Sequence, residues 1–217
     1  MNDRKVFILD FDGTFYSGEN VFSLVNAHVD SHRRNFFPCL TDCEYEKLIS
    51  ENPDFNSVYN GLDIANCLYE FKLKYPNLNI LPKHFYDWQN AYPDPIVLDG
   101  AEIIDTKFLK RLCSKYSVYV VSNSSLNHLK LYMNKMGINP KWFKKLIGNK
   151  FTLKDRTKKH YYSSIMQKEN VEPSSVYVVG DSERSDLFPA KQLNMQTFLI
   201  SKASEVSEVL KSIKLDV

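Results

Sequence analysis

Two carboxylates stand one residue apart near the start of the chain, as Asp10 and Asp12. They directly follow residues 6–9 (Val-Phe-Ile-Leu), an apolar run typical of a buried strand. Two carboxylates at the end of a buried strand are costly to keep desolvated unless a cation or a proton compensates their charge. The segment therefore predicts a metal-assisted carboxylate site.

Two later apolar runs also end in polar residues. Residues 118–123 end in Ser122 and Asn123, and residues 176–181 end in Asp181. Near-continuous apolar, β-branched and aromatic residues are typical of parallel strands that are covered on both faces. Because ligands of such sheets bind beyond the carboxyl ends of the strands, these polar residues are candidates for the same site.

Helical patterns alternate with these strands. Apolar residues recur every three to four positions near 101–114 and near 158–169, and another helical pattern ends before Gly137. Weaker strand candidates lie at 145–148 and 196–200. The alternation predicts an α/β fold with a doubly wound, Rossmann-like parallel sheet.

Residues 18–95 interrupt the alternation. A structureless loop of that length is improbable inside a compact domain, and the segment has helical patterns instead, at 41–50, 57–74 and 81–91. We therefore expect a helical subdomain inserted into an α/β core that is formed by residues 1–17 and 96–217.

The polar residues together resemble the four motifs of the haloacid dehalogenase superfamily of phosphohydrolases. The matching positions are Asp10 and Asp12 with Gly13 and Thr14, then Ser122, then a Lys, then Gly180 and Asp181 with Asp186. The resemblance covers the core, and it implies that the inserted segment is an α-helical cap. It also implies a Mg²⁺-dependent phosphatase that acts on a small phosphorylated metabolite, such as a sugar phosphate, a nucleoside monophosphate or phosphoglycolate.

The resemblance assigns roles to the first motif. Asp10 would be the nucleophile that forms an aspartyl-phosphate, and Asp12 would protonate the leaving oxygen and later activate water. The Mg²⁺ ligands would be Asp10, the main-chain carbonyl of Asp12, and Asp181. Gly13 would bring backbone N–H groups close to the phosphate, and Thr14 would hold the loop through a hydroxyl hydrogen bond. Family members that attack carbon lack the second Asp.

The second and third motifs would bind the phosphate. Ser122 would contribute its hydroxyl and Asn123 its backbone N–H. For the third motif, the spacing of one branch of the family selects Lys158, with Lys159, Lys154 and Arg156 as alternatives. A cation here would stabilise the transferring phosphoryl group.

Several assignments leave alternatives open. Asp186 would orient a metal-bound water or the lysine, or would instead be the N-cap of a helix near 187–193. Tyr16 is a candidate to line the pocket, whereas His128 is expected on the surface. The run 32–34 (His-Arg-Arg) is expected to be a solvated helix face rather than an anion clamp.

Three rival functions share this motif set. A phosphomutase or phosphotransferase would return the phosphoryl group to another hydroxyl, and a catalytically silent scaffold would only bind phosphate. Phosphonatase chemistry would need a Schiff-base lysine in the cap. The presence of both Asp10 and Asp12 argues against the silent scaffold, because binding alone does not require them.

The net charge and composition of the whole chain limit the classes of binding partner that we expect. The 217 residues carry a formal net charge of +2, which gives no electrostatic reason to expect nucleic acid or an anionic membrane. No apolar run approaches the ~20 residues of a membrane span, and the first residues contain no secretory signal, so we expect a cytoplasmic monomer or homodimer. Cys39 and Cys43 have a spacing that two zinc ligands could tolerate, but no second Cys/His pair follows at finger-like spacing, so the four cysteines are expected to be reduced.

Overall fold

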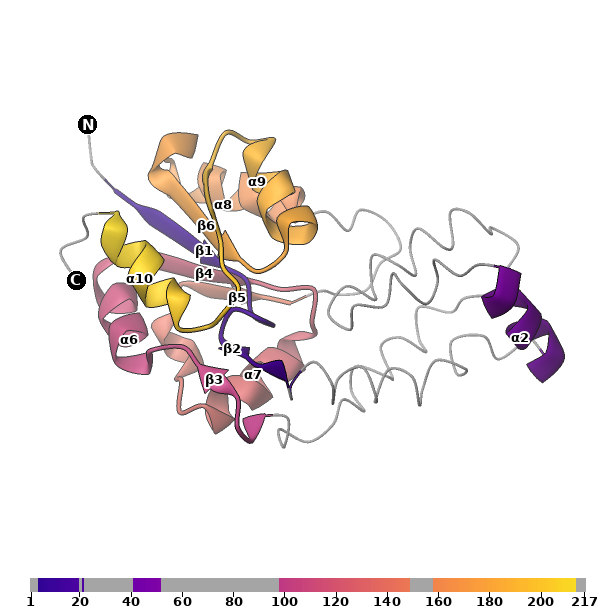
Figure 1. The fold of residues 1–217 in the computed structure, drawn as a ribbon. Helices are drawn as coiled ribbons and strands as arrows, with labels where there is room; N and C mark the ends of the chain where they lie inside the picture. The colour runs from indigo at the N-terminus through magenta and orange to yellow at the C-terminus, as the bar shows by residue number, and fades with distance from the viewer. Residues whose placement is uncertain (1–3, 20, 22–40, 52–97, 149–157, 214–217) are drawn as a thin grey trace.

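The computed structural model describes residues 4–19, 21, 41–51, 98–148 and 158–213. Its centre is a five-stranded sheet in the order β5-β4-β1-β6-β7, and every neighbouring pair is parallel (Figure 1). The strands are β1 (Val6–Leu9), β4 (Ser117–Val121), β5 (Lys145–Ile147), β6 (Val176–Gly180) and β7 (Gln196–Leu199). The predicted α/β fold with a parallel sheet is therefore confirmed.

Helices cover both faces of the sheet (Figure 1). Buried residues of β1 alternate between two cores, with Phe7 and Leu9 in one and Val6 and Ile8 in the other. The first core is completed by α6 (Thr106–Lys115), α7 (Leu126–Lys135) and α10 (Glu205–Ser212). The second is completed by α8 (Lys159–Glu169) and α9 (Phe188–Lys191). Burial on both faces explains why the strands read as continuous apolar runs.

Local signals set the ends of these helices. The Asp105 carboxylate caps α6 by accepting hydrogen bonds from two backbone N–H groups of the first turn. Helix α7 begins after Ser125, whose hydroxyl accepts from the backbone N–H of His128. The same helix stops before Gly137, whose φ of +70° is readily adopted only by glycine. The predicted stop at Gly137 is confirmed.

Short elements connect the larger ones. The 3₁₀ turns η3 (Pro140–Trp142) and η4 (Pro173–Ser175) precede β5 and β6. A π-helical segment, η5 (Glu183–Leu187), leads directly into α9. The helix predicted near 187–193 is present as α9, which is shorter than predicted and is preceded by the π-helical η5.

Only a small part of the expected cap lies within the described residues. Helix α2 (Asp42–Glu51) confirms the helix expected at 41–50, and it starts with a capping box in which Thr41 and Glu44 exchange hydrogen bonds. The strands β2 (Tyr16–Ser17) and β3 (Glu102–Ile103) pair antiparallel, which places the chain before and after the expected insertion side by side. The helices expected at 57–74 and 81–91, and the run 32–34, lie outside the described residues.

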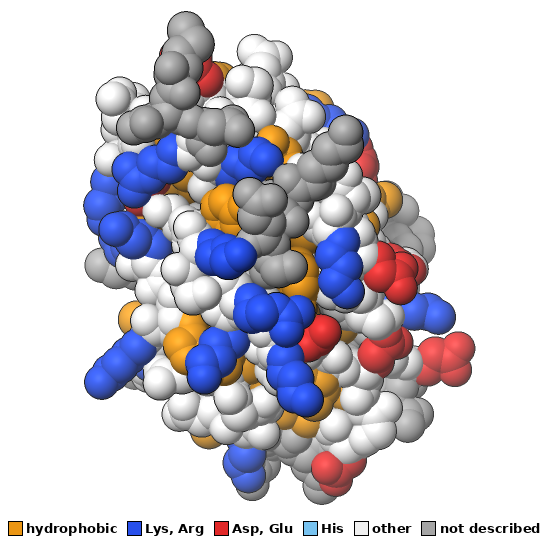
Figure 2. All heavy atoms as spheres, turned by 90° about the vertical axis from the view of Figure 1, so that its left-hand side faces the viewer, with side chains coloured by type: hydrophobic (Ala, Val, Ile, Leu, Met, Phe, Trp, Pro, Cys, Tyr) orange, Lys and Arg blue, Asp and Glu red, His pale blue; other side chains and the backbone are white. Residues whose placement is uncertain are grey.

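Charge is unevenly distributed over the surface. Figure 2 shows the side of the core that carries α6 and α10, where Lys and Arg side chains gather and Asp and Glu lie mainly to one side. Among the described helices, none has the length and apolar character needed to cross a membrane. The exclusion of nucleic acid as a partner remains a prediction from the near-neutral total charge.

Candidate active site

The sheet order gathers the predicted motifs at one edge. Strand β1 lies between β4 and β6, so that the residues following these three strands are neighbours in space. Asp10 follows β1, Ser122 follows β4 and Asp181 follows β6, while Lys158 immediately precedes α8. The carboxyl edge of a parallel sheet is where such folds bind ligands.

Three carboxylates form an acidic cluster beside one cation. Asp10, Asp181 and Asp186 each offer a carboxylate oxygen, and these oxygens lie within 4.8 Å of one another. The Nζ of Lys158 is 2.5 Å from the Oδ1 of Asp10 and 2.5 Å from the Oδ1 of Asp186. Three carboxylates therefore face one buried ammonium group, and their ionised forms together would leave a negative excess that suits a divalent cation.

The proton affinities of these groups reflect the crowding. Burial, together with the neighbouring Asp186, raises the pKa of Asp10 well above its ordinary value, although the Lys158 ammonium opposes the shift. Burial and Asp186 likewise raise the pKa of Asp181 to about 7. Burial disfavours the charged form of Lys158, but Asp10 and Asp186 outweigh it and raise the lysine's pKa. The cluster is thus short of positive charge at neutral pH.

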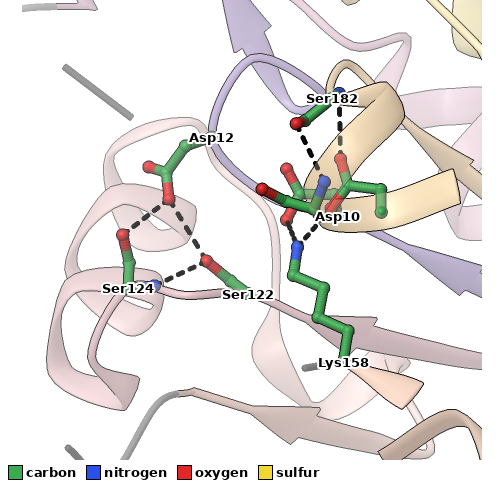
Figure 3. Close-up of polar contacts among 8 residues, drawn as sticks. Asp10, Asp12, Ser122, Ser124, Lys158 and Ser182 are labelled. Atoms are coloured by element: carbon green, nitrogen blue, oxygen red, sulfur yellow. Dashed lines mark hydrogen bonds and ion pairs between the residues drawn. The ribbon is translucent and has the colours of Figure 1, made fainter. Parts of the chain in front are cut away.

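The Asp12 side chain points to a different set of partners. Figure 3 shows the Asp12 carboxylate facing Ser122 and Ser124, while Asp10 faces Lys158. The Oδ2 of Asp12 accepts hydrogen bonds from the hydroxyls of Ser122 at 3.2 Å and Ser124 at 2.6 Å. Its Oδ1 lies 2.5 Å from the Tyr16 hydroxyl and 2.9 Å from the Nε2 of His128.

These partners stabilise the ionised form of Asp12. Burial by itself would raise the pKa of this carboxyl, but the charge of the His128 imidazole and the hydrogen bonds from His128, Ser124 and Tyr16 outweigh burial and lower the pKa well below its ordinary value. Two carboxylates separated by one residue therefore have pKa values shifted in opposite directions, because their surroundings differ.

Gly13 allows the first motif to approach Asp181. Its φ is +77°, and a Cβ built at this position would lie 2.2 Å from the Oδ2 of Asp181. No side chain other than hydrogen fits this contact, and the positive φ also favours glycine. The close approach that the structure shows at Gly13 is with the Asp181 carboxylate, and the predicted approach of its backbone to a phosphate stays a prediction.

Lys158 is the cation that the fold brings to Asp10. It is buried, whereas Lys159 is half-buried and not paired with Asp10 in the described contacts. The alternatives Lys154 and Arg156 lie outside the described residues. Asp186 accepts from Lys158 and from the backbone N–H of Ser182 at 3.0 Å, so it orients the lysine. Its alternative role as an N-cap is wrong, because Ser182 caps η5 and Asp186 lies inside that segment.

Three sequence expectations need correction or extension. His128 is buried and contacts Asp12, so its expected surface position is wrong. The Thr14 hydroxyl is buried without a hydrogen-bond partner among the described residues, so the predicted loop hydrogen bond is wrong. Ser124 had no predicted role, although its position two residues after Ser122 at a strand end could have suggested one. Asn123 is half-buried beside Ser122.

Comparison with known proteins decides the family. A profile of the haloacid dehalogenase-like hydrolases matches residues 4–194. The chain belongs to this family. A search of curated protein sequences returned no significant match.

Solved structures of haloacid dehalogenase-like hydrolases share the fold of this family member. A haloacid dehalogenase-like hydrolase from Streptococcus pneumoniae has a TM-score of 0.58 at 12% identity, with 97% of this chain and 91% of that chain covered. A predicted phosphoglycolate phosphatase from Haemophilus somnus has a TM-score of 0.56 at 15% identity, over 97% and 99%. The Bacillus subtilis protein YfnB, a HAD-hydrolase solved with bound magnesium, has a TM-score of 0.55 at 14% identity, over 96% and 99%.

Proposed function

We propose that this hydrolase is a Mg²⁺-dependent phosphatase that cleaves a small phosphate monoester through an aspartyl-phosphate on Asp10. The observation that carries the proposal is the separation of the two carboxylates of the first motif. Asp10 lies with Lys158 and the acidic cluster, whereas Asp12 is held apart by hydroxyl and imidazole groups. A nucleophile beside a cation and a separate proton carrier are what phosphoryl transfer through a covalent intermediate requires.

The residues present fit a magnesium ion. Carboxylate and carbonyl oxygens are the ligands that Mg²⁺ prefers, and the acidic cluster has more negative charge than Lys158 alone compensates. Asp10, Asp181 and the main-chain carbonyl of Asp12 would hold the ion. When bound, it would reduce the repulsion between the Asp10 carboxylate and the phosphate and polarise the phosphoryl oxygens.

The first chemical step is the attack of an Asp10 carboxylate oxygen on phosphorus. The bond between phosphorus and the leaving oxygen breaks, and Asp12 supplies the proton that this oxygen takes up. Lys158 neutralises the charge that spreads over the phosphoryl oxygens. Ser122 and the backbone of Asn123 would hold those oxygens.

The second step regenerates the enzyme. Asp12, now ionised, takes a proton from a water molecule as the water oxygen attacks phosphorus. The bond between Asp10 and phosphorus breaks, which releases inorganic phosphate and restores the Asp10 carboxylate. The lowered pKa of Asp12 keeps this carboxyl ionised, which is the form that can accept the proton.

The presence of Asp12 also separates this proposal from dehalogenation. The attack on a carbon–halogen bond has a halide as leaving group, which needs no proton. A buried carboxylate with four polar partners would then have no proton to supply in the first step. The proposal therefore favours an oxygen leaving group, as in a phosphate ester.

Hydrolysis of p-nitrophenyl phosphate with and without Mg²⁺ tests the proposal, followed by a panel of sugar phosphates, nucleoside monophosphates and phosphoglycolate. The last is included because one structural relative is a predicted phosphoglycolate phosphatase. We expect Mg²⁺-dependent release of phosphate that Asp10→Asn abolishes. The matched control Asp105→Asn changes an exposed helix cap to an equally good one and should keep full activity. Phosphate release by a folded Asp10→Asn protein would contradict the proposal.

A further inference from the structure

His128 lies in the active site although the sequence suggested the surface. It is the third residue of α7 and is only 4% exposed. Its Nε2 is 2.9 Å from the Oδ1 of Asp12. Since the lowered pKa of Asp12 makes this carboxylate an acceptor, the imidazole donates the hydrogen of this contact.

The surrounding residues fix the orientation of the imidazole ring. The ring stacks on Tyr132 at a centroid distance of 4.2 Å and an interplanar angle of 29°. The edge-to-face contact with Phe11 has a centroid distance of 6.0 Å and an angle of 87°. The backbone N–H of His128 is bound by the cap hydroxyl of Ser125. The packing therefore aims the Nε2 at Asp12 before any substrate binds.

The two oxygens of Asp12 have unequal surroundings. The partners of Oδ1 are Tyr16 and His128, both of which are buried. One partner of Oδ2 is Ser124, which is half-buried, and the other is Ser122, the hydroxyl expected to bind phosphate. Oδ2 is thus the oxygen on the side where a substrate would lie.

We propose that His128 is a positioning residue that holds Oδ1 of Asp12, so that Oδ2 exchanges the proton with the leaving group and with water. The inference rests on the proposed role of Asp12 in phosphate ester hydrolysis. In this role His128 acts only through Asp12. Its removal leaves Asp12 in place but lets the carboxylate rotate away from the orientation in which Oδ2 can act.

The dependence of the rate on the leaving group tests this role. Phenyl phosphate releases a more basic leaving group than p-nitrophenyl phosphate and therefore depends more on a general acid. We expect His128→Ala to lower kcat/KM for phenyl phosphate at least about tenfold more than for p-nitrophenyl phosphate. His128→Gln should recover most of the loss, because its side-chain amide can donate to Oδ1. The matched control His160→Ala, at an exposed position of α8, should leave both values unchanged.

The outcomes separate this inference from the proposed function. Equal losses for the two esters in a folded His128→Ala protein, or no recovery in His128→Gln, would overturn the positioning role while leaving the phosphatase intact. Hydrolysis of neither ester by the wild-type protein with Mg²⁺ would overturn both. If His128→Ala does not fold, as a thermal melt would show, His128→Asn replaces it, because its shorter amide does not reach Oδ1.

Discussion

At the residue scale, two chemically identical side chains lie in different environments, and the proposed mechanism gives them different roles. Asp10 and Asp12 are separated by one residue, yet burial among acids raises the pKa of the first, and hydrogen bonds with His128 lower that of the second. A phosphate dianion bound beside Asp12 would oppose this lowering and favour the protonated form that the first step needs. The same carboxyl could then act as acid and as base.

The close approach at Gly13 gives a residue-scale prediction. Gly13→Ala places a Cβ in the space of the Asp181 carboxylate, so Asp181 must move out of the acidic cluster. We expect kcat/KM for p-nitrophenyl phosphate to fall at least about a hundredfold, as for other losses of precise active-site geometry. Steady-state kinetics at saturating Mg²⁺ measure the effect.

Gly137→Ala is the matched control for this change. Gly137 has nearly the same φ, +70°, but a Cβ there meets nothing within 4 Å. The variant should lose about 1 kcal/mol of unfolding free energy from backbone strain and keep its activity. Similar activity in the two variants would show that the contact with Asp181 is unimportant.

At the scale of elements, α8 links the two ends of the sheet. It starts next to Lys158 at the active site and ends at Glu169, which is buried beside β4. The Glu169 carboxylate accepts hydrogen bonds from Tyr119 and Ser117 and pairs with Arg4 at 2.7 Å. Burial would raise the pKa of Glu169, but these hydrogen bonds outweigh it and lower the pKa. The carboxylate therefore anchors the C-terminal end of α8 to β4 and to Arg4, which precedes β1.

Replacement of this anchor should affect stability and not chemistry. Glu169→Gln keeps the shape but removes the charge, and we expect a loss of about 1–3 kcal/mol in the free energy of unfolding by urea. The value of kcat/KM should change less than about twofold, because the site lies at the opposite edge of the sheet. Glu172→Gln, an exposed position beyond the end of α8, is the control and should change neither quantity. A stability of Glu169→Gln equal to that of the control would refute the anchor.

The core elements could be predicted from the sequence because their signals are local. The apolar runs predicted β1, β4 and β6. The polar residues at their carboxyl ends predicted a site that contains Asp10, Asp12 and Asp181. The partners of Asp12 could not be predicted in the same way. His128 becomes buried only when α7 packs against the residues that follow β1, and no local pattern encodes that contact. The π-helical segment η5 was not predicted either, and its Asp186 contacts Lys158, which is distant in the sequence.

At the scale of the whole molecule, the acidic cluster is expected to make stability depend on pH and on a bound cation. The pKa of Asp181 is raised to about 7 in the fold and is lower in the unfolded chain, so the folded state binds more protons between these values. The contribution of protonated Asp181 to the stability of the fold is complete at acidic pH and is lost as the pH rises toward 7. A bound cation would offset this loss of folding stability, because it favours the ionised carboxylates.

Urea unfolding from pH 5 to pH 8 measures this linkage. In EDTA, we expect the free energy of unfolding to fall with rising pH, by at most about 1.4 kcal/mol per pH unit for one group. In Mg²⁺ the curve should be flatter. Asp181→Asn removes the titrating group, so its curve in EDTA should also be flatter than that of the wild type. Identical slopes for wild type and Asp181→Asn in EDTA would contradict the assignment.

The phosphorylation of Asp10 is the claim on which the rest depends. Asp12→Ala removes the base of the second step, while p-nitrophenyl phosphate needs little acid in the first, so the aspartyl-phosphate should accumulate in this variant. Acid quenching followed by borohydride reduction converts an aspartyl-phosphate to homoserine, which peptide mass spectrometry can locate. We predict homoserine at position 10 in Asp12→Ala and none in the Asp10→Asn protein. Release of p-nitrophenol with no modification at position 10, or modification of another residue, would contradict the account.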